Sequence, residues 1–191
     1  METKINSALK EWAIAVEALA QGNTIMLLRK GGIREENGRF TVACDHVWLY
    51  PTYEHQKPEL LKPEYAQKVT PVNSGWHPDQ IKISSWAQIT DILTVSEESK
   101  ITALLPYHIW NEKFVSDRLK WKPRQPLYIL LLRTYHLDKI SEIPYSPEYG
   151  GCKSWINLQL EINPTESLPV FNDEEYNQQI SVIKQIINNF P

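Results

Sequence analysis

The amino-acid sequence predicts a single α+β domain, in which a mixed or barrel-like β-sheet is flanked by an N-terminal and a C-terminal helix. Three observations lead to this fold class. Apolar residues recur at helical spacing near both ends of the chain, strand-like runs lie between them, and no Pro-, Gly- or Ser-rich linker divides the 191 residues. A chain of this length can form one sizeable core, so we expect one domain over residues 1–191.

The N-terminal segment has apolar residues at intervals of three and four, which predicts an amphipathic helix of about four turns. Gly22 ends the predicted helix, as glycine commonly does. The lysines and glutamates fall largely outside the apolar stripe, so one face should pack on the sheet. We expect Trp12 to belong to the core rather than to a ligand site. The stripe consists of Ile5, Ala8, Leu9, Trp12, Ala13, Val16, Leu19 and Ala20.

Several runs in the rest of the chain predict strands. The apolar run that follows Pro126 requires burial on both faces, which is typical of a central strand. Pro51 is expected to end the strand before it. Asn172 and Glu175 have the spacing of a capping box, which predicts the start of the C-terminal helix. The predicted strands cover residues 24–28, 39–43, 46–50, 81–83, 86–95, 127–137 and 155–162.

The densest candidate site is the stretch from Thr24 to Arg39, where a short apolar run ends at a basic pair and a double glycine. Glycines allow a ligand to approach the backbone, and the flanking cations could pair with phosphate or carboxylate. The stretch therefore predicts an anion site. The alternative is a solvated surface turn, because Gly-Gly is a general turn signal and the spacing matches neither a P-loop nor a dinucleotide fingerprint.

A second candidate is the polar loop between Pro51 and Pro58, directly after a predicted strand, where site residues are often found. Glu54 and His55 are adjacent, so in an extended chain they would point to opposite sides and form no acid/base pair. The alternative is a histidine satisfied within the loop. Together the two stretches supply the predicted ligand-binding residues Arg29, Lys30, Arg34, Glu35, Tyr53, Glu54, His55 and Gln56.

A third group of residues combines cations with tryptophans. Asn111 is predicted to cap a short helix over residues 112–119. The basic residues that follow it suit a phosphate backbone with stacked bases, or alternatively a solvated helix end and connector anchored by the tryptophans. The group consists of Lys113, Arg118, Lys120, Lys122 and Arg124, with Trp110 and Trp121 beside them.

Composition restricts the function. The net charge of −3 and the pI near 6.0 argue against a protein whose main function is to bind duplex nucleic acid, although they are compatible with a local basic pocket.

The N-terminal segment lacks the unbroken apolar core of a signal peptide, and no apolar run reaches the ~18 residues of a membrane span. We expect a soluble, cytoplasmic protein. The two cysteines, Cys44 and Cys152, should both be reduced and partly buried.

Motifs for metal, phosphate-loop, nucleophile-elbow and dinucleotide sites are absent from the sequence, so it predicts no cofactor and no metal. The five histidines have no ligand spacing. Carboxylates such as Asp45, Glu54 and Glu35 could still converge in the folded chain.

Several blocks of the sequence resemble the signature segments of an uncharacterised bacterial family known only as a domain of unknown function, number eighteen-oh-two. The resemblance spans most of residues 8 to 160, and it implies family membership without an activity. The blocks are ALKEWAIAVEALAQGNTIMLLRKGGIREE, LYPTYEHQ, IWNEKFVSDRLKW, LYILLLRTYHL and GCKSW.

A second, local resemblance covers about 25 residues: a helix with a tryptophan, a glycine, and a strand ending in arginine. This pattern is similar to the opening of the ASCH domains, which belong to the PUA-like β-barrels. The resemblance implies a PUA- or ASCH-like barrel, RNA or nucleotide binding, and in some members a small hydrolase. Asn23 and Leu28 stand where that family usually has lysine and glutamate. The pattern rests on Trp12, Gly22, Thr24, Ile25, Arg29 and Lys30.

We therefore expect a protein that binds a nucleotide or a nucleic-acid element such as RNA through a basic pocket, in an oligomeric state that the sequence does not define. One alternative is a metal-dependent or acid/base hydrolase of phosphodiester or N-acyl bonds, with Glu54 or Glu35 and His55 as acid/base groups. Another is a protein-interaction module without a small ligand. The choice depends on whether residues 29–35 and 53–56 line one concavity.

Overall fold

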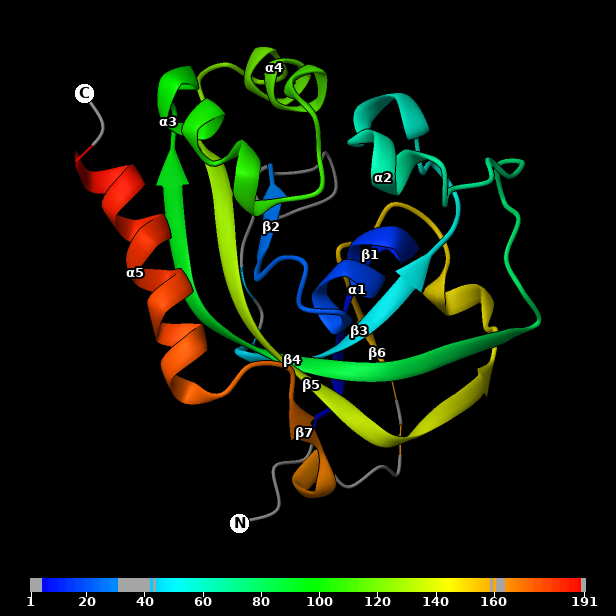
Figure 1. The fold of residues 1–191 in the computed structure, drawn as a ribbon. Helices are drawn as coiled ribbons and strands as arrows, with labels where there is room; N and C mark the ends of the chain where they lie inside the picture. The colour runs from blue at the N-terminus through cyan, green and yellow to red at the C-terminus, as the bar shows by residue number, and fades with distance from the viewer. Residues whose placement is uncertain (1–4, 31–41, 43, 159, 161–163, 190–191) are drawn as a thin grey trace.

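The computed structural model describes residues 5–30, 42, 44–158, 160 and 164–189. These residues form one α+β domain around a curled, mixed sheet of seven strands (Figure 1). The strand order is β2-β5-β4-β3-β1-β6, and β7 pairs with β5. The strands are β1 (Ser7–Trp12), β2 (Met26–Arg29), β3 (His46–Thr52), β4 (Gln80–Val95), β5 (Leu127–Pro144), β6 (Trp155–Asn157) and β7 (Leu168–Pro169). The helices are α1 (Ala13–Ala20), α2 (Pro63–Ala66), α3 (Glu98–Ala103), α4 (Glu112–Lys120) and α5 (Asp173–Asn189). The predicted fold class is confirmed.

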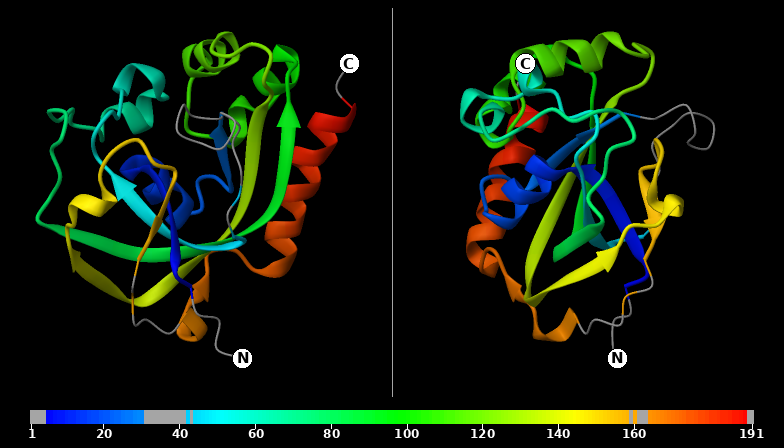
Figure 2. Two further views of the ribbon diagram at one scale, coloured as in Figure 1. Left: turned by 180° about the vertical axis from the view of Figure 1, so that it is seen from behind. Right: turned by 90° about the vertical axis from the view of Figure 1, so that its right-hand side faces the viewer.

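The long antiparallel pair of β4 and β5 gives the sheet its curl. Register shifts interrupt the pairing between Ile83 and Ser85 and between Ile89 and Asp91, and such irregularities bend a strand and increase its twist. Helix α1 lies on the concave side of this strand pair, and α5 lies on its opposite side (Figures 1 and 2). The β5 residues Ile129 to Leu132 are therefore all buried, as predicted for a central strand.

The N-terminal helix is shorter than predicted, because residues 7–12 form strand β1. This strand runs parallel to β3 and antiparallel to β6, and its two faces pack into two different hydrophobic clusters, with Ala8 in one and Leu9 in the other. Burial on both faces places apolar residues at intervals that imitate a helical stripe. The helix begins at Ala13 and ends at Ala20. Gly22 follows it with a φ of 72°, and a Cβ at this position would lie 2.9 Å from the Phe171 ring, so glycine is favoured there.

The predicted caps of the two later helices are confirmed. The Asn111 side chain accepts a hydrogen bond from the Phe114 N–H at 3.1 Å, so α4 begins where predicted. At the start of α5, Asn172 and Glu175 exchange side-chain to backbone hydrogen bonds at 2.9 and 3.0 Å.

Several strand boundaries differ from the prediction. Strand β3 continues through Pro51, because β4 pairs only as far as Trp48 and proline is tolerated where a strand lacks a neighbour on one side. Of the predicted strand 155–162, residues 155–157 form β6, and Ile156 and Leu158 are buried as expected, whereas residues 159, 161 and 162 lie outside the described residues. The predicted strand 39–43 falls largely outside the described residues.

Both cysteines are free, as predicted; Cys44 is half-buried, whereas Cys152 is exposed rather than partly buried. Within the residues that the structure describes, no helix is both long and apolar enough to cross a membrane.

Candidate functional site

A cavity of about 670 Å³ lies between the C-terminal ends of β1, β2 and β3, helix α4 and the turn before β6. Its described lining includes five cations, two carboxylates and five aromatic rings. The cations are Lys10, Arg29, Lys30, Arg118 and Lys153; the carboxylates are Glu11 and Glu54; the rings belong to Trp12, Trp110, Phe114, Trp121 and Tyr145. The cavity therefore combines an excess of positive charge with apolar, stackable surface.

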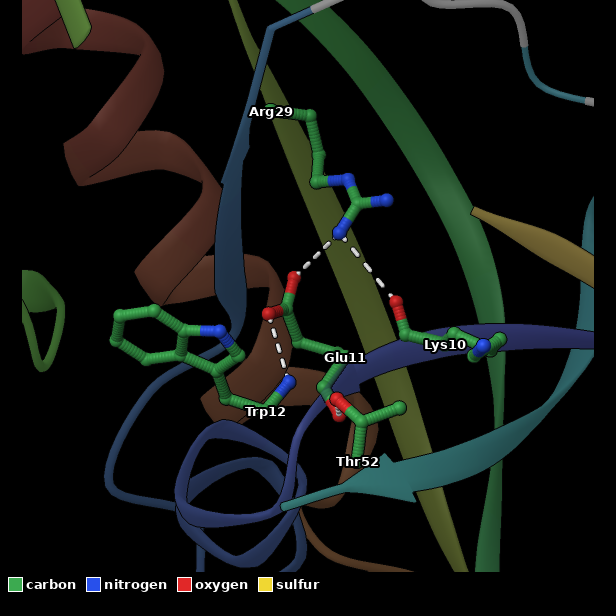
Figure 3. A network of polar contacts seen from close by, with 5 residues as sticks. All are labelled: Lys10, Glu11, Trp12, Arg29 and Thr52. Carbon is green, nitrogen blue, oxygen red and sulfur yellow. Dashed lines mark hydrogen bonds and ion pairs between the residues drawn. The ribbon is translucent and has the colours of Figure 1, made fainter. Parts of the chain in front are cut away.

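An ion pair joins the β1 and β2 sides of this cavity. Arg29 reaches from β2 to the Glu11 carboxylate on β1, with 2.7 Å between Nη1 and Oε2 (Figure 3). The other carboxylate oxygen of Glu11 accepts the Trp12 N–H at 2.8 Å, and the Glu11 carbonyl accepts the Thr52 hydroxyl at 3.0 Å. β1 and β2 are not paired in the sheet, so this network fixes two separate strands across the cavity.

Lys30 joins the end of β2 to helix α4. Its ammonium donates to the carbonyls of Arg118 at 2.7 Å and Leu119 at 3.3 Å, in the last turn of the helix. A cation there is favourable because the last carbonyls of a helix lack helical partners. Burial, and secondarily the nearby Arg118, lower the pKa of Lys30. Lys30 thus fixes the helix that carries Arg118.

Arg118 is held differently from the other arginine of the cavity. Its guanidinium carbon lies 5.0 Å from the Phe114 ring centroid and 6.0 Å from that of Trp121. Within the described residues, no hydrogen-bond acceptor or ion-pair partner engages its guanidinium. Burial, partly offset by Glu11, lowers its pKa, although arginine remains charged at neutral pH. Arg118 is therefore a stacked cation with hydrogen-bond donors available to a ligand.

The opposite wall is the turn that precedes β6. The Lys10 ammonium donates to the carbonyls of Tyr149 at 2.5 Å and Gly151 at 2.9 Å, which ties this turn to β1. Gly151 has a φ of 74°, so glycine suits the turn. Burial lowers the pKa of Lys10, with Glu54 acting in the opposite direction. Cys152 and Lys153 follow directly and line the cavity.

Glu54 and His55 do not point apart as predicted. The His55 Nε2 atom lies 3.7 Å from Glu54 Oε2, and the same carboxylate oxygen accepts the Gly75 N–H. The reason is backbone geometry: His55 has a φ of 62°, so the chain is left-handed at this residue rather than extended. A carboxylate and an imidazole therefore face the same cavity.

Four of the eight predicted ligand-binding residues, Arg29, Lys30, Glu54 and His55, line this one cavity. Tyr53 lines a smaller neighbouring cavity, where its ring meets Trp76 edge-on. Gln56 is buried, and its side-chain oxygen accepts the Ile14 N–H at the start of α1, at 3.0 Å. Arg34 and Glu35 lie outside the described residues.

The prediction missed several lining residues for identifiable reasons. Lys10 and Glu11 were assigned to the outer face of a helix, whereas both are buried in β1. The turn that precedes β6 was not among the predicted sites, although Gly150, Gly151 and Lys153 repeat the glycine pair and the cation that marked the stretch after β2. Arg118 and Trp121 were identified as a separate basic group, and the fold brings them to the same cavity.

In the described part of the chain, no three His, Cys, Asp or Glu side chains lie where they could share a metal ion. Asp45 and Glu54 do not converge into such a group, and Glu35 lies outside the described residues.

Comparison with known families gives a match over most of the chain. The family described as Domain of unknown function (DUF1802) matches residues 8–181. The chain belongs to the DUF1802 family. The resemblance of the sequence blocks to this family is thereby confirmed. No curated protein sequence matches this DUF1802 chain significantly.

Solved structures similar to this DUF1802 chain include an ASCH protein from Zymomonas mobilis. It is 12% identical, with a TM-score of 0.46, and the match covers 92% of this chain and 94% of that one. A single-substitution mutant of that protein is 12% identical as well, with a TM-score of 0.44 and coverage of 94% and 99%.

Proposed function

We propose that this DUF1802 protein binds a nucleotide, or one nucleotide unit of a nucleic acid, in the 670 Å³ cavity. The observation that carries the proposal is Arg118, a cation stacked between aromatic rings with no acceptor among the described residues. A phosphate would satisfy its guanidinium with charge-assisted, bidentate hydrogen bonds. A base would stack on the aromatic surface beside it.

The other lining residues support a negatively charged ligand. Arg29 and Lys30, which we propose to face the ligand, keep positive charge beside Arg118 although each also holds a protein group. Lys153 adds a further cation from the opposite wall. Glu54 and His55, which we also assign to the ligand site, could accept hydrogen bonds from a base or sugar. Tyr53 and Gln56, which do not line the cavity, and Arg34 and Glu35, which lie outside the described residues, complete the proposed set of ligand-binding residues.

Size and charge favour a small nucleic-acid ligand over a duplex. Small-molecule sites typically measure about 300 to 1,000 Å³, and this cavity falls within that range. The whole chain has a net charge of −3, so the attraction for phosphate is local rather than global. A cytoplasmic location, where both free cysteines would stay reduced, completes the proposal.

The proposal is tested with Arg118→Gln, which removes the charge but keeps much of the side-chain length. Calorimetric titration with adenosine and uridine 5′-monophosphates should show binding to the unmodified protein. The Arg118→Gln variant loses one charge-assisted contact and should bind the nucleotides about ten- to a hundredfold more weakly. Lys139→Ala is the matched control, since Lys139 is exposed on β5 and does not line the cavity. Equal affinities of Arg118→Gln and the unmodified protein would exclude the proposed phosphate contact.

A second candidate is a hydrolase of phosphodiester or N-acyl bonds, which the Glu54–His55 approach in the cavity favours. An imidazole near a carboxylate can transfer protons to or from a reacting group. Hydrolysis of bis-p-nitrophenyl phosphate or an N-acylated nucleoside, with and without divalent cations, should then depend on both residues. Either His55→Ala or Glu54→Gln should lower the rate by about a hundredfold or more. No turnover by the unmodified protein under any of these conditions would remove this candidate.

A further inference from the structure

The C-terminal end of helix α4 and the residues after it form a basic segment at the edge of the cavity, and this segment contains an exposed tryptophan. We define the rim segment as residues 118–124, from Arg118 through Arg124. Trp121 lines the cavity yet is 38% exposed, so its ring spans the boundary between the cavity and solvent. Large aromatic side chains at such a boundary are suited to stacking against a ligand that passes it.

Two cations lie over this ring. The Arg118 guanidinium lies 6.0 Å from the Trp121 ring centroid, and the Lys122 ammonium lies 4.8 Å from it. Lys120 and Arg124 are exposed, and no carboxylate occurs between residues 118 and 124. Four cations in one short segment stand out in a chain whose acidic residues outnumber its basic ones. A single strand presents bases, which stack on aromatic rings, and phosphates, which pair with cations, so this ring and the cations beside it suit such a ligand.

The rim segment ends in a turn with a left-handed residue. Lys122 has a φ of 49°, and the Lys122 carbonyl accepts the Gln125 N–H at 2.9 Å. Pro123 lies inside this turn and limits its backbone freedom. Residues in left-handed conformations are uncommon without glycine and often occur at functional sites. His55, at the cavity wall, is the other such residue in the described chain.

We infer that the cavity holds one nucleotide of a longer single strand, and that the strand leaves across the rim segment with a base stacked on Trp121. This inference rests on the proposed function and extends it to the ligand class, single-stranded nucleic acid. Mononucleotide binding uses the cavity, whereas binding of an oligonucleotide also uses Lys120 and Arg124. Affinity should therefore rise with strand length.

The experiment compares adenosine 5′-monophosphate with a hexa-adenylate RNA, its deoxy counterpart and a hexaglutamate peptide. The unmodified protein should bind one or both hexanucleotides at least about tenfold more tightly than the monophosphate, since stacking contributes about 1 to 3 kcal/mol per base. A difference between RNA and DNA would identify the 2′-hydroxyl as a contact.

The Lys120→Ala/Arg124→Ala variant separates the rim from the cavity. It should weaken hexanucleotide binding about tenfold and monophosphate binding less than about twofold. The slope of log affinity against log salt should become shallower by about 1.4, since about 0.7 is expected for each lost phosphate contact on a single strand. Trp121→Ala should also reduce the length dependence, and Trp121→Phe should restore much of it. Lys139→Ala should leave all these values unchanged.

The possible failures are distinguishable. Equal affinities for the monophosphate and the hexanucleotides would overturn the rim inference and leave the cavity proposal standing. Hexaglutamate binding as tight as that of the hexanucleotides would overturn the inference of a nucleic-acid path, because stacking would then contribute nothing. No binding of any nucleotide would overturn both proposals.

Discussion

Arg29 and Arg118 lie in the same cavity but are held differently. Arg29 is paired with the buried carboxylate of Glu11, so its removal would disturb the link between β1 and β2 as well as any ligand contact. Arg118 rests on aromatic rings, with no acceptor among the described residues. For this reason Arg118, which the sequence placed in a different candidate group, is the cleaner residue with which to test ligand binding.

His108 gives a prediction at the same scale. The side chain is 2% exposed, and burial, together with the nearby Lys62, lowers its pKa from 6.5 to about 4. The unfolded chain therefore binds a proton between these pH values that the folded chain does not. Above pH 6.5 the imidazole is neutral in both states, and His108 does not affect the free energy of unfolding. As the pH falls from about 6.5 toward 4, protonation of the unfolded chain lowers the free energy of unfolding.

The free energy of unfolding should thus be about 2 kcal/mol lower at pH 5 than at pH 7.5 through this residue alone. Guanidinium titrations at both pH values measure the loss, and His108→Gln should remove most of it because glutamine does not titrate. An identical pH dependence in the variant would show that other groups cause the acid destabilisation.

At the scale of elements, helix α4 has the most direct effect on the site, since it carries Phe114, Arg118 and, at its end, Trp121. Its cap, Asn111, accepts the Phe114 N–H and also donates to the carbonyls of Glu59 and Leu61, at 2.9 and 3.1 Å. Asn172 caps α5 through the capping box alone, among the contacts described for its side chain. The two asparagines are a matched pair with different tertiary roles.

Asn172→Ala should cost about 1 kcal/mol, the usual value of an N-cap. Asn111→Ala should cost about 2 to 3 kcal/mol, because two further hydrogen bonds are lost. It should also weaken nucleotide binding, whereas Asn172→Ala should not. Chemical unfolding and calorimetric titration check both statements. Equal stability losses in the two variants would contradict the structural link through Asn111.

Element boundaries could be predicted where local chemistry determines them. Residues within one segment determine the caps of α4 and α5, the glycine turn after α1 and the uniformly apolar centre of β5. Strand β1 could not be predicted in this way. Lys10 and Glu11 are charged but buried, and periodicity analysis assumes that charged residues face water. Their burial depends on partners distant in sequence, namely Arg29 and the turn at 149–151.

At the scale of the whole molecule, the curled sheet joins three groups of residues that the sequence presents separately. The stretch around Arg29, the loop with Glu54 and the rim segment lie far apart in the chain, yet all reach one cavity. Segment-by-segment reasoning could identify each group, but not their convergence, because convergence depends on strand order. The result is a local concentration of cations in a chain with a net charge of −3.

The central claim, that this cavity binds a nucleotide, is tested most directly at Cys152. This free thiol is exposed and lines the cavity, whereas Cys44 is half-buried and is not part of the lining. Alkylation by N-ethylmaleimide can be followed at each thiol by mass spectrometry, with and without adenosine 5′-monophosphate. We expect the nucleotide to slow the reaction of Cys152 at least about tenfold at a concentration tenfold above its Kd, because the reagent then reaches only the unoccupied fraction. The rate at Cys44 should not change. If calorimetry confirms that the nucleotide binds, but saturating nucleotide leaves the alkylation rate at Cys152 unchanged, the result contradicts the claim and places the ligand elsewhere on the protein.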